Sequence, residues 1–281
     1  MNDALAGRDH SLHATWPLHR RQLLQLLGWY AVITATWIGI GKLITGPLKD
    51  SAVTRADLRA AKWFVAHRTP MWDRLTVWGS GLAETLTKII VTTILALVLL
   101  KVWKRWFEPL ILAVTLIVEA SAFIVVTTVV NRPRPPVARL DNSPVGSSFP
   151  SGHVAAAAAY FAITVIIFWH TRKVWARALA VIVTSLIPLI VALSRMYRGM
   201  HFLSDVVGGA LLGATAVTVT VLVMRRAPEA QQAISEADTS AFERGASTRA
   251  DTDGSSVAPT ARPCRVLASM PPRAVSSPRS R

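Results

Sequence analysis

Residues 147–170 read SSFPSGHVAAAAAYFAITVIIFWH, in which a short polar stretch leads directly into a long apolar run. The run over residues 154–170 suits a membrane-spanning helix, because a span needs about 20 apolar residues, and fewer where neighbouring helices bury it. Its row of alanines favours close packing, since small side chains let two helices approach in a membrane. Gly152 and His153 stand at the start of this helix, where backbone N–H groups and the helix dipole favour an anion. The stretch therefore predicts a transmembrane helix with a polar, anion-binding start.

Similar apolar runs recur along the chain of 281 residues, of which 52% are hydrophobic and only 17% charged. This composition, with a mean hydropathy of +0.39, is too apolar for an ordinary soluble domain of this length. Six spans are predicted, over residues 26–45, 84–102, 109–130, 154–170, 178–194 and 205–223. The predicted fold is therefore all-α, a six-helix transmembrane bundle over residues 26–224. A cytoplasmic segment, 1–25, precedes it, and a basic tail, 225–281, follows it and is expected to be disordered.

The segment 46–83 between the first two spans is polar and mixed, and two interpretations of it stay open. Aromatic and charged residues alternate in WFVAHRTPMWDRLTVW, residues 63–78, a pattern typical of a helix that lies in the membrane interface. A plain connecting loop explains the same composition equally well.

Basic residues gather beside the spans, which is the usual signal of membrane orientation. Four clusters share one side of a six-span protein: Arg20 and Arg21; Lys101, Lys104 and Arg105; Arg172, Lys173 and Arg177; Arg225 and Arg226. The positive-inside rule makes that side cytoplasmic, although the segment 46–83 carries further basic residues on the opposite side. A net charge of +15 divided among such clusters and the tail is typical of lipid headgroup contacts, not of nucleic-acid binding. We therefore predict a multi-pass protein of the cell membrane.

With this topology, two extracytoplasmic loops bring polar residues to one end of the bundle. One loop joins the third and fourth spans and reads NRPRPPVARLDNSPVGSSFPSGH, and the other joins the fifth and sixth spans and reads SRMYRGMHFLSD. The residues that could act on an anion are Arg132, Arg134, Ser151, Gly152, His153, Ser194, Arg195, Arg198, His201 and Asp205.

This inventory suggests phosphoryl transfer, whose transition state spreads negative charge over three phosphoryl oxygens. Guanidinium groups supply paired donors to those oxygens, and Ser151 and Gly152 offer backbone N–H groups at a helix start. One of the two histidines can attack phosphorus, while the other protonates the leaving oxygen and later activates water. Asp205 lies four residues after His201 and can fix the tautomer of its ring if both lie on one helical turn.

No metal ion or other cofactor is predicted, because the arginines already provide positive charge. The candidate metal ligands are few, namely His153, His201 and Asp205. The single cysteine, Cys264, excludes an internal disulfide and a cysteine-based metal cluster.

Three motifs in these loops resemble the signatures of the type 2 phosphatidic acid phosphatase and vanadium haloperoxidase superfamily. Arg134-Pro135 is similar to the end of the first signature, and Pro150-Ser151-Gly152-His153 to the second. The third corresponds to Ser194-Arg195, His201 and Asp205 at their spacing here. The resemblance implies that His201 is the nucleophile, Asp205 its orienting partner and His153 the general acid. It also implies that Arg134, Arg195, Ser151 and Gly152 bind phosphate, with Ser194 part of the same motif.

The chain departs from the first signature at one position. The family's pattern has a lysine seven residues before the arginine, and Thr127 stands there in this sequence. We predict that Lys88, near the outer end of the second span, supplies the missing charge, with Arg132 and Arg198 as rival substitutes. Snorkelling of Lys88 to the headgroups is an equally good interpretation. Glu119, a carboxyl in the middle of the third span, is expected to have a structural role.

These observations predict a membrane lipid phosphatase that acts through a phosphohistidine. The resemblance offers phosphatidic acid, phosphatidylglycerol phosphate, or a polyprenyl phosphate or diphosphate such as undecaprenyl diphosphate, as substrates. The predicted partners of the protein are therefore the bilayer and a lipid phosphate. Three alternatives stay open, namely a phosphotransferase to a lipid or sugar acceptor, a vanadate-dependent haloperoxidase and a catalytically weak lipid-binding relative.

Overall fold

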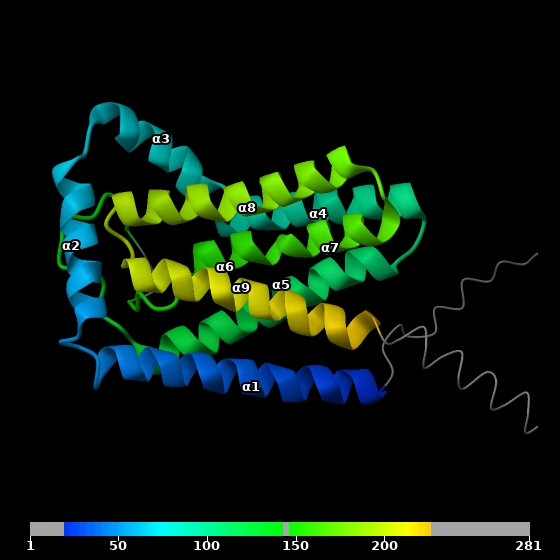
Figure 1. Ribbon diagram of the computed structural model, residues 1–281, viewed down its shortest axis with the longest axis horizontal. Helices are drawn as coiled ribbons and strands as arrows, with labels where there is room; N and C mark the ends of the chain where they lie inside the picture. The colour runs from blue at the N-terminus through cyan, green and yellow to red at the C-terminus, as the bar shows by residue number, and fades with distance from the viewer. Residues whose placement is uncertain (1–19, 143–145, 226–281) are drawn as a thin grey trace, which may run out of the picture. The chain divides into compact units, whose positions relative to one another are not determined.

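The computed structural model describes residues 20–142 and 146–225, and within these ranges it contains helices and no strand (Figure 1). The helices are α1 Arg20–Thr45, α2 Ala52–Ala66, α3 Pro70–Gly81, α4 Thr85–Trp103, α5 Phe107–Val130, α6 Gly152–Ala159, α7 Phe161–His170, α8 Val174–Tyr197 and α9 Leu203–Arg225. The predicted all-α fold is confirmed. The predicted disordered tail lies outside the described residues except for Arg225, and most of the predicted N-terminal segment does too.

Six helical segments of the described chain are long and apolar enough to cross a membrane: α1, α4, α5, α6 with α7, α8 and α9. They match the six predicted spans, so the chain is a multi-pass membrane protein. Two details differ. Helix α1 begins at Arg20, six residues before the predicted span. The fourth span is divided at Tyr160, whose hydroxyl lies 3.0 Å from the Thr92 hydroxyl and donates to the carbonyl of Lys88 on α4.

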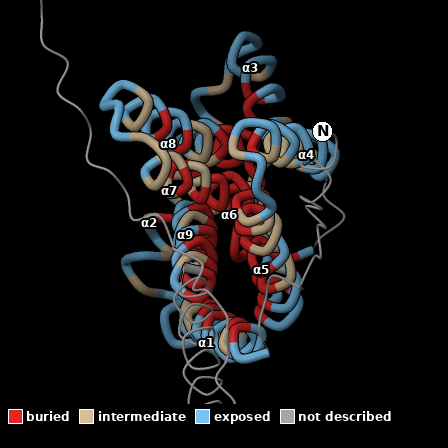
Figure 2. The backbone as a smooth tube through the Cα atoms, turned by 90° about the vertical axis from the view of Figure 1, so that its right-hand side faces the viewer, coloured by how far each residue is buried: buried red, intermediate tan, exposed pale blue. Residues whose placement is uncertain are grey.

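The centre of the bundle is formed by α5, α6 and α9, which are largely buried, whereas α4 and α8 are mostly exposed (Figure 2). Only 6% of the apolar stretch of α4 is buried inside the protein. Exposed Leu86, Ile94 and Leu97 on this helix are consistent with a surface that faces lipid, where apolar side chains cost nothing.

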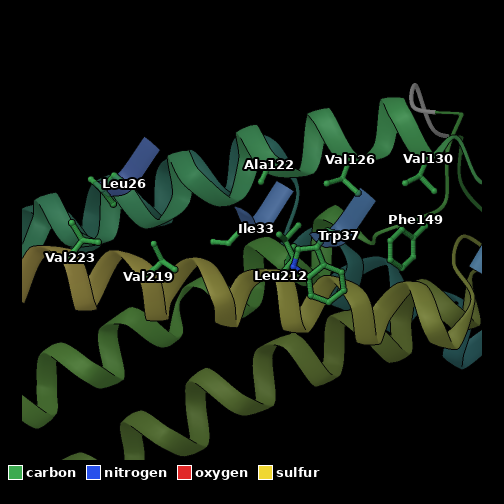
Figure 3. Packing of buried hydrophobic residues seen from close by; sticks show 11 residues of the cluster. Leu26, Ile33, Trp37, Ala122, Val126, Val130, Phe149, Leu212, Val219 and Val223 are labelled. Carbon is green, nitrogen blue, oxygen red and sulfur yellow. The ribbon is translucent and has the colours of Figure 1, made fainter. Parts of the chain in front are cut away.

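Helix α1 packs on α5 and α9 through an apolar cluster (Figure 3). Trp37 of α1, Val126 of α5 and Leu212 of α9 belong to it and are almost fully buried. Phe149, from the loop before α6, joins this cluster and ties the polar loop to the apolar core.

Helices α6 and α9 approach so closely that their contact requires glycine. A Cβ atom at Gly209 would lie 2.3 Å from the Ser151 carbonyl oxygen, and one at Gly213 would lie 2.3 Å from that of Ala155. The alanines of α6 are buried at this contact, as their small size predicted. The start of α6 is thereby fixed against the start of α9.

We expect Gly209→Ala to destabilise the protein by about 1–3 kcal/mol, because the added methyl group overlaps backbone atoms that cannot rotate away. Gly28→Ala is the matched control, since a Cβ atom at Gly28 meets nothing within 4 Å. Thermal unfolding in detergent measures both. Equal unfolding temperatures for the two variants would contradict the close contact of α6 and α9.

The segment 46–83 forms two short helices instead of a loop. Ser51 and Thr69 cap the starts of α2 and α3, and Pro70 occupies the first turn of α3. Figure 1 shows both helices at the end of the bundle where α1 ends and α4 begins. We call this the loop end. The described residues of the basic clusters lie at the opposite end of the bundle, beside the start of α1, the end of α4, the link between α7 and α8, and the end of α9.

Candidate active site

A cavity of about 180 Å³ opens at the loop end between the starts of α4 and α6 and the loops that follow α5 and α8. Its charged and titratable lining residues are Lys88, Glu119, Arg134, His153, Arg195 and His201. Gly152 lines it too. The structure therefore brings both predicted histidines and two of the predicted arginines to one small space.

His201 is buried at 4% exposure, and its ring is held by the backbone. Its Nδ1 lies 2.8 Å from the carbonyl oxygen of Ser148, which can only accept, so Nδ1 carries the proton and Nε2 holds a lone pair. Burial, together with the positive charges of Arg195 and Arg134, lowers the pKa of His201 well below its usual value. At neutral pH the ring is therefore uncharged, as a nucleophile must be.

Gly199 allows the chain to turn from α8 towards His201. Its φ of 73° lies in the left-handed region that favours glycine, and a Cβ atom there would lie 2.8 Å from the Ala138 carbonyl oxygen. The sequence RGMH is thus suited to bring His201 back to the bundle.

Asp205 lies beside His201 but does not hold its ring by a hydrogen bond. Its Oδ2 is 3.8 Å from Nδ1 of His201 and instead accepts from the backbone N–H of Phe202 at 2.8 Å. Its Oδ1 accepts from Arg132 Nη1 at 2.5 Å. Asp205 therefore supplies a nearby negative charge, while Ser148 orients the ring. A backbone carbonyl carries no residue signature, so the sequence could not indicate Ser148.

Arg134 and Arg195 both reach the cavity but are held by different partners. Arg134 Nη1 donates to the Met200 carbonyl at 2.6 Å. Arg195 Nη1 donates to Ser80 Oγ at 2.9 Å and to Asp141 Oδ2 at 3.2 Å. These contacts orient two guanidinium groups at one small cavity.

Asp141 is a site residue that sequence reasoning missed. It pairs with Arg198, whose Nε lies 2.7 Å from Asp141 Oδ2, and it also contacts Arg195. Burial raises the pKa of Asp141, but the hydrogen bond and charge of Arg198 and the charge of Arg195 outweigh this and hold the pKa below its usual value. Asp141 is therefore an anion at neutral pH. Arg198 forms the other half of this pair and does not line the cavity.

Three predicted substrate-binding residues are placed differently from Arg134 and Arg195. The Ser151 N–H already donates to the Asp205 carbonyl at 2.9 Å, so it is not free for phosphate. The buried Ser151 hydroxyl has no partner among the described residues. Arg132 lies outside the cavity in ion pairs with Asp57 and Asp205. Ser194 lines a second, mostly apolar cavity of about 770 Å³ between α2, α3 and α8.

Lys88 lines the cavity and Thr127 does not. Thr127 is buried, and its hydroxyl has no partner among the described residues. Glu119, for which a structural role is expected, lies in the cavity wall with Lys88. The cavity wall thus carries three basic side chains, Lys88, Arg134 and Arg195, and one carboxyl group, so its charge favours an anion as the ligand.

Two histidine rings and three basic groups around one small cavity suit phosphoryl transfer. His201 can present a lone pair, the arginines and Lys88 can neutralise the oxygens, and His153 at the start of α6 faces the same space. Within the described ranges, no three His, Cys, Asp or Glu side chains gather as a metal site.

Comparison with known proteins identifies relatives of this chain. Residues 108–229 match the family model of the PAP2 superfamily. The matched segment contains every predicted site residue except Lys88.

Two relatives match different lengths of the chain. Phosphatidylglycerophosphatase B of Bacillus subtilis strain 168 is 27% identical over 177 residues, which are 61% of this chain and 84% of that protein. Human sphingosine-1-phosphate phosphatase 2 is 34% identical over 87 residues, which are 31% of this chain. The matched part spans only 22% of the human protein.

A solved structure has the same fold. The crystal structure of a transmembrane PAP2 type phosphatidylglycerolphosphate phosphatase from Bacillus subtilis superposes with a TM-score of 0.57 at 24% identity. The superposition covers 71% of this chain and 94% of that one. The resemblance predicted from the three motifs is confirmed: residues 108–229 of this chain match the PAP2 superfamily.

Proposed function

We propose that this chain is an integral membrane phosphatase that hydrolyses lipid phosphates or diphosphates through a phosphohistidine on His201. The observation that carries the proposal is the single cavity lined by His201, His153, Arg134, Arg195 and Lys88. The names of the relatives support a lipid phosphate as the substrate, since they are phosphatases for phosphatidylglycerophosphate and sphingosine-1-phosphate.

In the first step, Nε2 of His201 attacks phosphorus and the bond from phosphorus to the lipid oxygen breaks. His153 gives its proton to that oxygen, so a neutral alcohol, or for a diphosphate the lipid monophosphate, leaves. Arg134 and Arg195 hold the phosphoryl oxygens while their charge is redistributed, with Lys88 as a further cation. In the second step, His153 takes a proton from water, the water oxygen attacks phosphorus, and His201 is released together with phosphate.

The site is proposed to face the extracytoplasmic side. The loop end lies opposite the basic clusters, which the positive-inside rule assigns to the cytoplasm. A site on this side is accessible to a polyprenyl diphosphate released on the outer face, as well as to glycerolipid and sphingoid phosphates.

The test is phosphate release by purified protein in detergent with a chelator, from phosphatidylglycerol phosphate, phosphatidic acid, sphingosine-1-phosphate and undecaprenyl diphosphate. We expect release from at least one of these lipids without added metal. Folded protein that releases phosphate from none of them contradicts the proposal. Phosphate that appears on an added alcohol instead of in solution indicates a transferase, and bromide oxidation with vanadate indicates a haloperoxidase.

Lys88→Met is expected to lower kcat/KM by roughly tenfold or more, mainly through KM, because it removes one charge-assisted contact to phosphate. Lys101→Met is the matched control, since Lys101 is an exposed lysine at the other end of the same helix. Steady-state kinetics on the preferred lipid measure KM and kcat/KM for both variants. An unchanged KM in Lys88→Met would show that Lys88 does not replace the lysine of the first signature.

A further inference from the structure

Asp57 is a buried carboxylate on α2, outside the segment that matches the PAP2 family. It is 2% exposed, although α2 is a short amphipathic helix at the surface of the bundle. Its Oδ1 accepts from the backbone N–H of Ser204 at 2.9 Å, and its Oδ2 accepts from Arg132 Nη2 at 2.9 Å and from the Ser204 hydroxyl. Two of these contacts are to Ser204 in the first turn of α9, and the third is to Arg132 in the loop after α5.

Arg132 connects Asp57 to the candidate active site. Its Nη2 binds Asp57, while its Nη1 binds Asp205 Oδ1 at 2.5 Å and Ser204 Oγ at 2.7 Å. The guanidinium also lies 4.3 Å above the ring of Phe202. Arg132 is therefore fixed between two carboxylates and an aromatic ring, and it is 5% exposed.

The same contacts fix the backbone next to His201. The Ser204 N–H belongs to the first turn of α9, where amides have no partner within the helix, and Asp57 satisfies it from another helix. Asp205 satisfies the N–H of Phe202, the residue after His201. The short connection from α8 to α9 is thus held by two carboxylates.

We propose that Asp57 is a positioning residue for His201, acting through Arg132, Ser204 and Asp205. This inference rests on the proposed function. Asp57 does not line the cavity. It is therefore expected to affect the attack by His201 and not the binding of phosphate.

The charges give a reason for this arrangement. When Nε2 of His201 bonds to phosphorus, the ring becomes positive, and a nearby negative charge stabilises it. Arg132 alone would cancel the charge of Asp205, but Asp57 shares that guanidinium and leaves the three groups with one net negative charge. The other charged or titratable side chains that line the cavity with His201 are Arg195, Arg134, Lys88, His153 and Glu119, so basic groups predominate there.

The test compares Asp57→Asn with Asp50→Asn, an exposed aspartate just before α2. Asp57→Asn is expected to lower kcat roughly tenfold or more while KM stays within about twofold, and Asp50→Asn to change neither. Isothermal titration calorimetry measures binding affinities directly and does not depend on turnover. Orthovanadate can bond to the histidine nitrogen and mimic the attacked phosphorus, so its affinity should fall about tenfold in Asp57→Asn. The affinity for inorganic phosphate, which reports the cavity charges, should be retained.

Equal kcat values for folded Asp57→Asn and Asp50→Asn overturn the proposal, as does an equal loss of vanadate and phosphate affinity. If Asp57→Asn does not fold, Ser204→Ala takes its place, because it removes only a hydroxyl from the same network. We expect a several-fold loss of kcat from it, and an unchanged kcat overturns the inference.

The proposed function and this inference fail in different ways. Wild-type protein that releases no phosphate overturns the function. The difference between vanadate and phosphate affinities still decides whether Asp57 acts on His201.

Discussion

His201→Ala is expected to abolish phosphate release, with a loss of about 10⁴-fold or more, as found when a nucleophile is removed from a catalytic set that acts as a unit. Alanine leaves no atom to bond to phosphorus, and the remaining arginines can only bind the substrate. His67→Ala is the matched control, because His67 is an exposed histidine in the link between α2 and α3. The measurement is phosphate release from the preferred lipid, with thermal unfolding to verify the fold.

Substrate affinity should survive this substitution. Arg134, Arg195 and Lys88 still line the cavity, so binding of the lipid phosphate to His201→Ala is expected to stay within a few-fold of wild type. A His201→Ala protein that turns over like His67→Ala would contradict a role of His201 as nucleophile.

His153→Ala is expected to lower turnover of lipid phosphates by roughly 10²–10⁴-fold, the usual contribution of a general acid. The first step should recover with p-nitrophenyl phosphate, because p-nitrophenolate leaves without a proton. The measurement is the amount and rate of p-nitrophenolate released in the first turnover, before water attack on the phosphoenzyme limits the reaction. An equal loss in this first turnover for lipid phosphate and p-nitrophenyl phosphate would show that His153 does not protonate the leaving group.

The spans could be predicted from the sequence because hydropathy over about 20 residues reports directly on the lipid environment. The short helices α2 and α3 could not be predicted with the same certainty. Their stability depends on tertiary contacts, such as that of Asp57 with Arg132, more than on local pattern. The division of the fourth span at Tyr160 was not predicted either, and the hydroxyl of Tyr160 contacts α4, which is distant in sequence.

The candidate site was partly predictable for a related reason. Motif spacing indicated His153, His201, Arg134 and Arg195, and the structure places all four at one cavity. Spacing says nothing about which carboxylate pairs with which guanidinium.

The residues around that set show this limit. The sequence did not indicate Asp141 as the partner of Arg198, or Asp57 as the partner of Arg132. Arg132 had been expected at the phosphate, and Ser194 in the same site, but both face other surroundings. Lys88, by contrast, lies where the sequence predicts it: near the outer end of the second span, in the wall of the cavity.

The central claim is that phosphate is transferred to His201, and the most direct measurement is to trap that intermediate. Purified protein is mixed with a lipid labelled with ³²P in its terminal phosphate, quenched in alkali within the first turnover, and digested for peptide mapping. We predict label on the peptide that contains His201, stable in alkali and lost in acid as a phosphorus–nitrogen bond is. His201→Ala should carry none. Phosphate released at full rate with no acid-labile label on wild-type protein, or with label on another residue, would contradict the account.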